Sequence, residues 1–247
     1  MYPLAASTLF IIASSVLLAY TLFGISGFGT ALIAAPLLSL YLPLPKIVPL
    51  LALLDVLAAC NNVYHDRKFA QRSALKTLLP TLLLGACIGA TLLLQAQLHT
   101  LMLGMGVLLV VYAIYGWCKR PPSARMAQAL ALPLGLTGGV LGAVFGSGGF
   151  LYAIYLSATV PDKQAIRATL STLIACSTLF RVVLYMTMGT YADTQLLLLC
   201  LCLLPCMLLG TYLGRRLSHT LPPAQFQQTI HGLLLLTGIH ILYRYWN

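Results

Sequence analysis

The stretch Gly142-Ala143-Val144-Phe145-Gly146-Ser147-Gly148-Gly149 interrupts an apolar segment that runs from Ala127 to Thr159. Glycines allow a tight turn, and the piece from Gly148 to Thr159 is too short to cross a hydrocarbon core of about 30 Å as a helix. We therefore expect a broken helical hairpin at residues 127–159. The run Gly24-Ile25-Ser26-Gly27-Phe28-Gly29 breaks the apolar segment of residues 4–42 in the same way and predicts a second hairpin there.

Composition places these hairpins in a lipid bilayer. Of 247 residues, 60% are hydrophobic and only 7% are charged, whereas soluble domains carry about 25% charged residues. With a mean hydropathy of +0.93, the chain has too few polar side chains to cover a globule in water. The net charge is 14 − 4 = +10, but the Lys and Arg residues are spaced thinly between apolar runs. We therefore expect an integral membrane protein without a nucleic-acid partner.

The sequence gives no support for a metal or a cofactor. The seven cysteines lie almost entirely within apolar runs, the five histidines are scattered, and neither C-x-x-C nor H-E-x-x-H occurs. We expect no metal site and no cofactor.

The N-terminal apolar segment lacks a basic region ahead of it and leads directly into another apolar stretch, so we interpret it as mature protein rather than a secretory signal.

The remaining apolar segments are long enough to cross the membrane, or nearly so. They cover residues 47–64, 75–94, 101–117, 168–188, 196–213 and 226–245. We expect a first repeat at residues 1–117 that begins with the hairpin 4–42. A linker at 118–125 joins it to a second repeat at 126–247 that begins with the hairpin 127–159.

Basic residues predict the orientation, because short loops rich in Lys and Arg stay in the cytoplasm. Lys46 and Arg244 fall at the expected outer face, and Arg181 lies within a membrane segment. The other 11 of the 14 fall in loops that we expect to be cytoplasmic: Arg67, Lys68, Arg72, Lys76, Lys119, Arg120, Arg125, Lys163, Arg167, Arg215 and Arg216. We therefore expect the linker in the cytoplasm, the first hairpin at the outer face, the second at the inner face, and both termini outside the cytoplasmic membrane.

Two motifs recur in the same order in both halves. Pro80-x4-Gly85-x3-Gly89 returns as Pro205-x4-Gly210-x3-Gly214, an offset of 205 − 80 = 125, and Gly27-x-Gly29 returns as Gly146-x-Gly148, an offset of 146 − 27 = 119. Gly104 and Gly232 give a third, weaker match. Each half contains three crossings, an odd number, so the second must be inserted upside down. The predicted fold class is an all-α polytopic membrane protein with two inverted-topology repeats, a plan common among secondary transporters.

These motifs resemble those of the TauE/SafE sulfite exporter family, also called the toluene sulfonate uptake permeases. In the first half the resemblance is carried by Gly24 to Pro36, Asn61-Asn62-x-Tyr64, Arg67-x-Phe69, and Pro80 to Gly89. In the second half it is carried by Gly142 to Leu151, Arg167-Ala168-Thr169-x-Ser171-Thr172, and Gly189 to Asp193. Where the family usually has a longer glycine run, this chain has Ser26-Gly27-Phe28-Gly29. The resemblance implies transport of sulfite or an organosulfonate across a bacterial or archaeal cytoplasmic membrane, outward or inward.

An anion site is expected where the two half helices begin, at about Gly29 and Gly149. Helix N-termini present backbone N–H groups and a partial positive charge, and two that face each other across an inverted repeat would bind an anion. The alternative is that these glycines serve only tight turns and helix contacts. The candidate substrate-binding residues are Ser26, Gly27, Gly29, Thr30, Asn61, Asn62, Gly146, Ser147, Gly148, Gly149, Thr172 and Arg181.

Arg181 is the cation that we place deep in a crossing helix, and such a charge suggests a function. Counted along helices, Arg181 and Asp55 differ in depth by only about 5 Å, so they can pair. Either the pair holds two repeat-related helices together, or Arg181 contacts the anion while Asp55 neutralises it or carries a coupling proton. Ser and Thr residues such as Thr172, Ser177 and Thr178 can face the anion or bond back to their own helix.

Other classes of function are less well supported. An enzyme would need a nucleophile with a base or paired carboxylates, yet the chain has no Glu and only Asp55 among four Asp residues lies within a membrane segment. We therefore expect no enzymatic activity. The expected function is secondary transport of a small sulfur-containing anion by alternating access, with a passive anion channel of the same fold as the alternative. The sequence leaves the oligomeric state open.

Overall fold

The computed structural model describes residues 6–95, 97–117, 129–217, 232, 235–236 and 238–243. All of the elements within these ranges are helices, including two short 3-10 turns, η1 (Arg67–Phe69) and η2 (Thr190–Ala192). The α-helices are α1 (Ala6–Ser26), α2 (Thr30–Leu38), α3 (Leu44–Asp66), α4 (Arg72–Gln95), α5 (Leu98–Trp117), α7 (Ala131–Phe145), α8 (Gly149–Thr159), α9 (Lys163–Thr187) and α10 (Thr194–Leu217). The predicted linker at 118–125 and most of the predicted segment 226–245 lie outside the described residues.

Five of the described helices are long and apolar enough to cross a membrane: α1, α3, α4, α9 and α10. Three more apolar helices, α5, α7 and α8, contribute shorter stretches. The outward faces of the long helices are apolar, as contact with lipid requires. Phe10 of α1 is 75% exposed, Leu84 of α4 61% and Leu201 of α10 62%. The prediction of an all-α polytopic membrane protein is confirmed.

Most helices extend a few residues beyond the apolar segments from which they were predicted. For example, α9 begins at Lys163 rather than Ala168, because the Asp162 carboxylate accepts hydrogen bonds from the backbone N–H groups of Gln164 (3.3 Å) and Ala165 (3.0 Å). An N-cap of this kind satisfies backbone donors that the helix leaves unpaired. Hydrophobicity identifies only the apolar part of a helix that lies in lipid, so it does not predict the polar residues at the helix ends.

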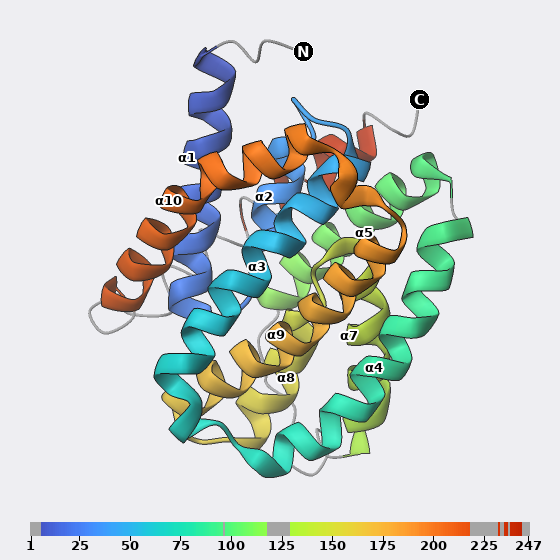
Figure 1. Ribbon diagram of the computed structural model, residues 1–247. Coiled ribbons are helices and arrows are strands. Elements are labelled where there is room, and N and C mark those ends of the chain that lie inside the picture. The colour runs from blue at the N-terminus through green and yellow to red at the C-terminus, as the bar shows by residue number, and fades with distance from the viewer. Residues whose placement is uncertain are drawn as a thin grey trace.

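Six of the helices pack in three pairs: α1 lies along α10, α4 lies along α7, and α3 lies along α9 between them (Figure 1). Glycine allows close approach in both outer pairs. A methyl group added at Gly85 of α4 would collide with the Leu136 carbonyl of α7, and one added at Gly210 of α10 would lie 2.7 Å from the Leu17 carbonyl oxygen of α1. Gly85 and Gly210 are 125 residues apart, and Leu17 and Leu136 are 119 apart, which are the two offsets of the predicted repeat. This correspondence supports the duplication, which stays a prediction.

Both helical breaks occur at glycines with a left-handed backbone. Gly27 follows α1 with φ = 81°, and Gly146 follows α7 with φ = 72°. In each case the glycine N–H donates to the carbonyl four residues earlier, to Phe23 over 2.7 Å and to Gly142 over 3.0 Å. A left-handed residue here ends a helix and turns the chain, and glycine adopts it without the steric cost of a Cβ atom. The short helices α2 and α8 follow these turns, and α2 is buried over almost its whole length.

Candidate functional site

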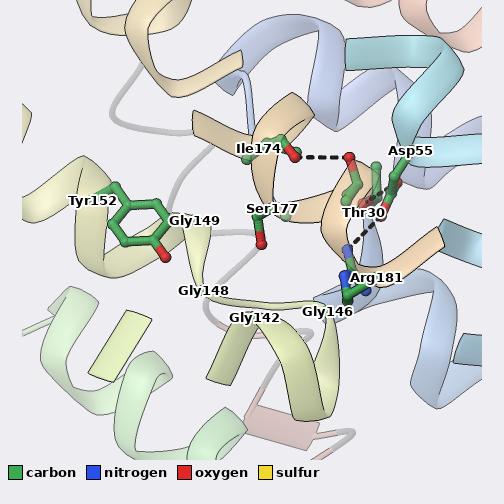
Figure 2. A pocket seen from close by; sticks show the side chains of 12 residues that line it. Thr30, Asp55, Gly142, Gly146, Gly148, Gly149, Tyr152, Ile174, Ser177 and Arg181 are labelled. Atoms are coloured by element: carbon green, nitrogen blue, oxygen red, sulfur yellow. Dashed lines mark hydrogen bonds and ion pairs between the residues drawn. The ribbon is translucent and has the colours of Figure 1, made fainter. Parts of the chain in front are cut away.

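A small cavity lies where the short helices α2 and α8 begin, between α3, α7 and α9 (Figure 2). It offers about 20 Å³ of space to the centre of a water molecule, which is enough for one water. Its lining residues are Gly29, Thr30, Asp55, Gly142, Gly146, Gly148, Gly149, Tyr152, Ile174, Ser177, Thr178 and Arg181. The two glycine-rich breaks, far apart in sequence, therefore border one space inside the protein.

The N-termini of α2 and α8 both border this cavity. Helix α2 begins at Thr30 after Gly29, and α8 begins at Gly149 after Gly148; neither N-cap residue supplies a side-chain hydrogen bond to its helix. The first N–H groups of a helix have no partner within it, and the helix dipole adds a partial positive charge there. Two such ends at one cavity make an environment that favours negative charge.

Arg181 of α9 supplies a full positive charge to the same cavity. The residue is 2% exposed, and its Nη2 atom lies 3.7 Å from Oδ2 of Asp55. Its Nε is buried and has no hydrogen-bond partner within the part of the chain that the structure describes. A Cβ atom at Gly146 would lie 2.9 Å from Arg181 Nη1, so the absence of a side chain at Gly146 leaves room for the guanidinium group.

Asp55 of α3 is held in place by two hydroxyl groups. Its Oδ1 atom accepts hydrogen bonds from Tyr20 Oη of α1 (2.8 Å) and from Thr30 Oγ1 of α2 (2.7 Å), while Oδ2 faces Arg181. Figure 2 shows Thr30, Asp55 and Arg181 turned toward one another. The carboxylate is 1% exposed, so its charge is balanced by Arg181 and by hydrogen bonds rather than by bulk water.

Hydroxyl groups complete the polar lining on the side of α8 and α9. Tyr152 Oη is buried and has no hydrogen-bond partner among the described residues. Ser177 Oγ lies close to Gly142 of α7, where an added Cβ atom would be 3.2 Å from it. Thr178 Oγ1 instead donates back to the Ile174 carbonyl over 2.7 Å. Tyr152 is therefore a donor with capacity for a ligand, whereas Thr178 is satisfied by its own helix.

The structure brings together about half of the residues that the sequence suggested. Those at the cavity are Gly29, Thr30, Asp55, Gly146, Gly148, Gly149 and Arg181. Those that do not line it are Ser26, Gly27, Asn61, Asn62, Ser147 and Thr172. Arg181 pairs with Asp55, as their similar depth along the helices suggested.

Local geometry explains why the second group lies elsewhere. Asn62 is seven residues beyond Asp55 on α3, about 10 Å along the helix, and binds Arg215 instead. Ser26 Oγ donates to the Leu22 and Phe28 carbonyls, and Thr172 Oγ1 donates to the Ala168 carbonyl. Ser147 lies between two lining glycines, but its buried Oγ atom is outside the lining.

Sequence reasoning missed Tyr20, Gly142, Tyr152 and Ile174. A helical count could have found Ile174, which lies seven residues, or about two turns, before Arg181 on the same face of α9. Tyr20 and Tyr152 lie within apolar helices, where a buried hydroxyl group needs a hydrogen-bond partner. That need is a signal in the sequence that could have pointed to both residues. No group of three or more His, Cys, Asp or Glu side chains suited to a metal ion occurs among the residues that were described.

The family described as sulfite exporter TauE/SafE matches residues 12–241, nearly the whole chain. The chain belongs to the TauE/SafE sulfite exporter family. The resemblance stated from the sequence motifs is thereby confirmed. Membership, together with the long apolar helices, identifies a multi-pass membrane protein of a transporter family and supports transport of a sulfur-containing anion. No curated protein and no solved structure was found to match the chain.

Proposed function

We propose that the protein is a secondary transporter that carries sulfite or an organosulfonate across the cytoplasmic membrane by alternating access. The observation that carries this proposal is the meeting of two helix N-termini and a buried arginine at one cavity. A sulfur oxyanion presents several acceptor oxygens, which suit the N–H groups of α2 and α8 and the guanidinium group of Arg181. The cavity must widen to admit it, and the glycine turns at Gly27 and Gly146 are the places where the half helices can shift against the longer crossings.

Charge balance in the cavity supports coupling to protons. When the site is empty, Arg181 and Asp55 together are neutral. An incoming monoanion would leave one uncompensated negative charge in a buried place, which is costly. A proton on Asp55 removes that charge, so the loaded site, with Arg181, a neutral Asp55 and the anion, is neutral again. The proton and the anion would then move together, and the sum of their gradients would set the direction.

Flux in proteoliposomes tests both parts of this proposal. We expect Arg181→Gln to abolish sulfite flux, and the Asp55→Asn, Arg181→Gln double variant to remain inactive although its buried site is again uncharged. Arg216→Gln is the matched control, because Arg216 is an exposed arginine on α10 whose loss removes the same charge. Recovery of flux in the double variant would show that Arg181 serves only to pair with Asp55.

The pH dependence of flux tests the proposed coupling to protons. For wild-type protein we expect acidification of the supplying side to increase the flux of an organosulfonate, which stays a monoanion throughout, because a proton must accompany each anion. Asp55→Asn mimics the protonated carboxyl group, so we expect it to bind sulfite at neutral pH without needing a proton and to lose the proton dependence. Persistence of the same pH dependence in Asp55→Asn would exclude Asp55 as the coupling group.

A further inference from the structure

A second polar cluster, formed by Asn62, Asp66, Arg167 and Arg215, lies away from the central cavity. Arg167 Nη2 of α9 is 2.9 Å from Asp66 Oδ2 of α3, and both side chains are mostly buried, at 12% and 10% exposure. Arg215 of α10 donates to Asn62 Oδ1 from both Nε (3.0 Å) and Nη2 (2.7 Å). Arg215 also interacts electrostatically with Asp66 and Arg167, so the four side chains form one group.

The cluster carries more positive than negative charge. The chain has four Asp residues and no Glu. Asp55 faces Arg181, Asp193 faces Lys46, and Asp162 caps α9, which leaves Asp66 as the one acidic side chain for the two guanidinium groups. Arg215 is half-buried, so the cluster carries a net charge of +1 at a partly buried place, which favours an anion beside it.

Asn62 adds a donor that is ready for such an anion. The residue is 1% exposed, and its Oδ1 is directed to Arg215. Its Nδ2 is buried and makes no hydrogen bond within the described ranges. A buried amide without a partner is costly, and an oxygen of a bound anion would satisfy it.

The cluster is separated from the central cavity by a single turn. Gly27, between α1 and α2, lies against Arg167: a Cβ atom there would be 3.2 Å from both the Cγ atom and the carbonyl oxygen of Arg167. Two residues later, Gly29 lines the central cavity. Two residues of extended chain span at most about 7 Å, so the turn that borders the central cavity also packs against Arg167 of the cluster.

We propose that this cluster is a second oxyanion site, in which Arg167, Arg215 and Asn62 hold the transported sulfur anion before or after it passes the Gly27 turn. This inference rests on the proposed function for the identity of the anion. Asn62 Nδ2 supplies a buried N–H donor for an oxygen of sulfite or a sulfonate. The guanidinium groups of Arg167 and Arg215 supply positive charge beside it. By the orientation predicted from the basic loops, the site faces the cytoplasm.

Calorimetric titration of the purified protein with sulfite tests this site without requiring transport. Wild-type protein should bind two sulfite ions. The Asp55→Asn, Arg181→Gln variant, which lacks the central cation but keeps the site uncharged, should still bind one. Adding Arg215→Gln to that variant should weaken the remaining binding about tenfold or more, the effect of losing a charge-assisted hydrogen bond.

Controls separate this inference from its alternatives. Adding Arg216→Gln instead should leave the remaining binding unchanged, because Arg216 is exposed and stacks on Tyr212. If Arg215→Gln fails to fold, Arg215→Lys, which keeps the charge but not the fork of donors, should still weaken binding. One wild-type site that disappears with Arg181, or no binding at all, would overturn the second site. Retained binding at the cluster without any sulfite flux would instead count against the proposed transport.

Discussion

Arg181 supplies the positive charge at the central cavity, and its neighbour Gly146 leaves room for the guanidinium group. Buried ion pairs contribute little net stability, because the desolvation of two charges offsets their attraction. The Asp55 and Arg181 pair is therefore poorly explained as a device for stability alone. Its position beside two helix N-termini, with Arg181 Nε lacking a partner within the described part of the chain, fits a role in binding.

Replacement of Gly146 by alanine tests this dependence. Gly146 has φ = 72°, and an added methyl would lie 2.9 Å from both Arg181 Nη1 and Ala31 Cβ, so we expect Gly146→Ala to displace the guanidinium group. Gly189 is a matched control, since it has φ = 71° but nothing within 4 Å of an added methyl. Both variants should lose about 1–2 kcal/mol of unfolding free energy to backbone strain.

Only Gly146→Ala should also weaken sulfite binding, by about tenfold or more, as expected when a charge-assisted hydrogen bond is lost. Thermal unfolding measures the first effect and calorimetric titration the second. Equal sulfite affinity in the two variants would mean that the position of Arg181 does not matter for binding.

At the scale of helices, the paired packing of α4 with α7 and α1 with α10 forms the frame around the site. Glycines at the contacts bring backbones close, which in a membrane replaces the hydrophobic driving force that soluble helices use. Helices α2 and α8 are shorter and lie inside this frame (Figure 1). The frame is therefore the part that we expect to stay fixed while the short helices move.

Alanine at Gly85 and at Gly214 should disturb the two outer pairs alike. An added methyl at Gly85 would collide with the Leu136 carbonyl, and one at Gly214 with the Thr21 carbonyl. Backbone atoms in a packed helix cannot move aside cheaply, so we expect each substitution to cost about 1–3 kcal/mol. Gly104→Ala is the control, because its methyl would meet only the end of the Phe145 ring, at 3.2 Å. Thermal unfolding in detergent measures the losses; a Gly104→Ala variant that is as unstable as the others would contradict this account.

At the scale of the molecule, three ion pairs among the described residues join α3 to α9 or to the segment that follows α9. Lys46 pairs with Asp193 at one end and Asp66 with Arg167 at the other, with Asp55 and Arg181 between them. The order of these pairs shows that α3 and α9 run in opposite directions. The central cavity therefore lies part-way along the molecule, with one ion pair toward each end, which agrees with the proposed alternating access from two sides.

Labelling of introduced cysteines tests the predicted orientation in the membrane. Lys68 lies in a basic loop near the Asp66 end, and Ala192 lies near the Asp193 end; both are exposed. With the native cysteines replaced, we expect a membrane-impermeant maleimide to label Ala192→Cys in intact cells, and to label Lys68→Cys only after the cells are opened. The reverse pattern would show that the basic loops face outward and that the arginine cluster opens to the outside.

The sequence by itself determined the class of protein, the family and the location of the two helical breaks. These follow from hydrophobicity, from glycine and from the order of motifs, which act locally along the chain. It also suggested that Asp55 and Arg181 lie at similar depth, because rise per residue in a helix is constant.

Only the tertiary structure decided which polar residues share a space. The sequence suggested Asn62, Gly27 and Arg181 as parts of one site. In the structure, Asn62 belongs to the arginine cluster, Gly27 packs against Arg167 of that cluster, and Arg181 lies at the cavity. Tyr20 is part of the central site because its hydroxyl group donates to Asp55, 35 residues away in sequence. Such contacts depend on how helices rotate about their axes and on which glycines let them approach, and these are set by packing between distant segments.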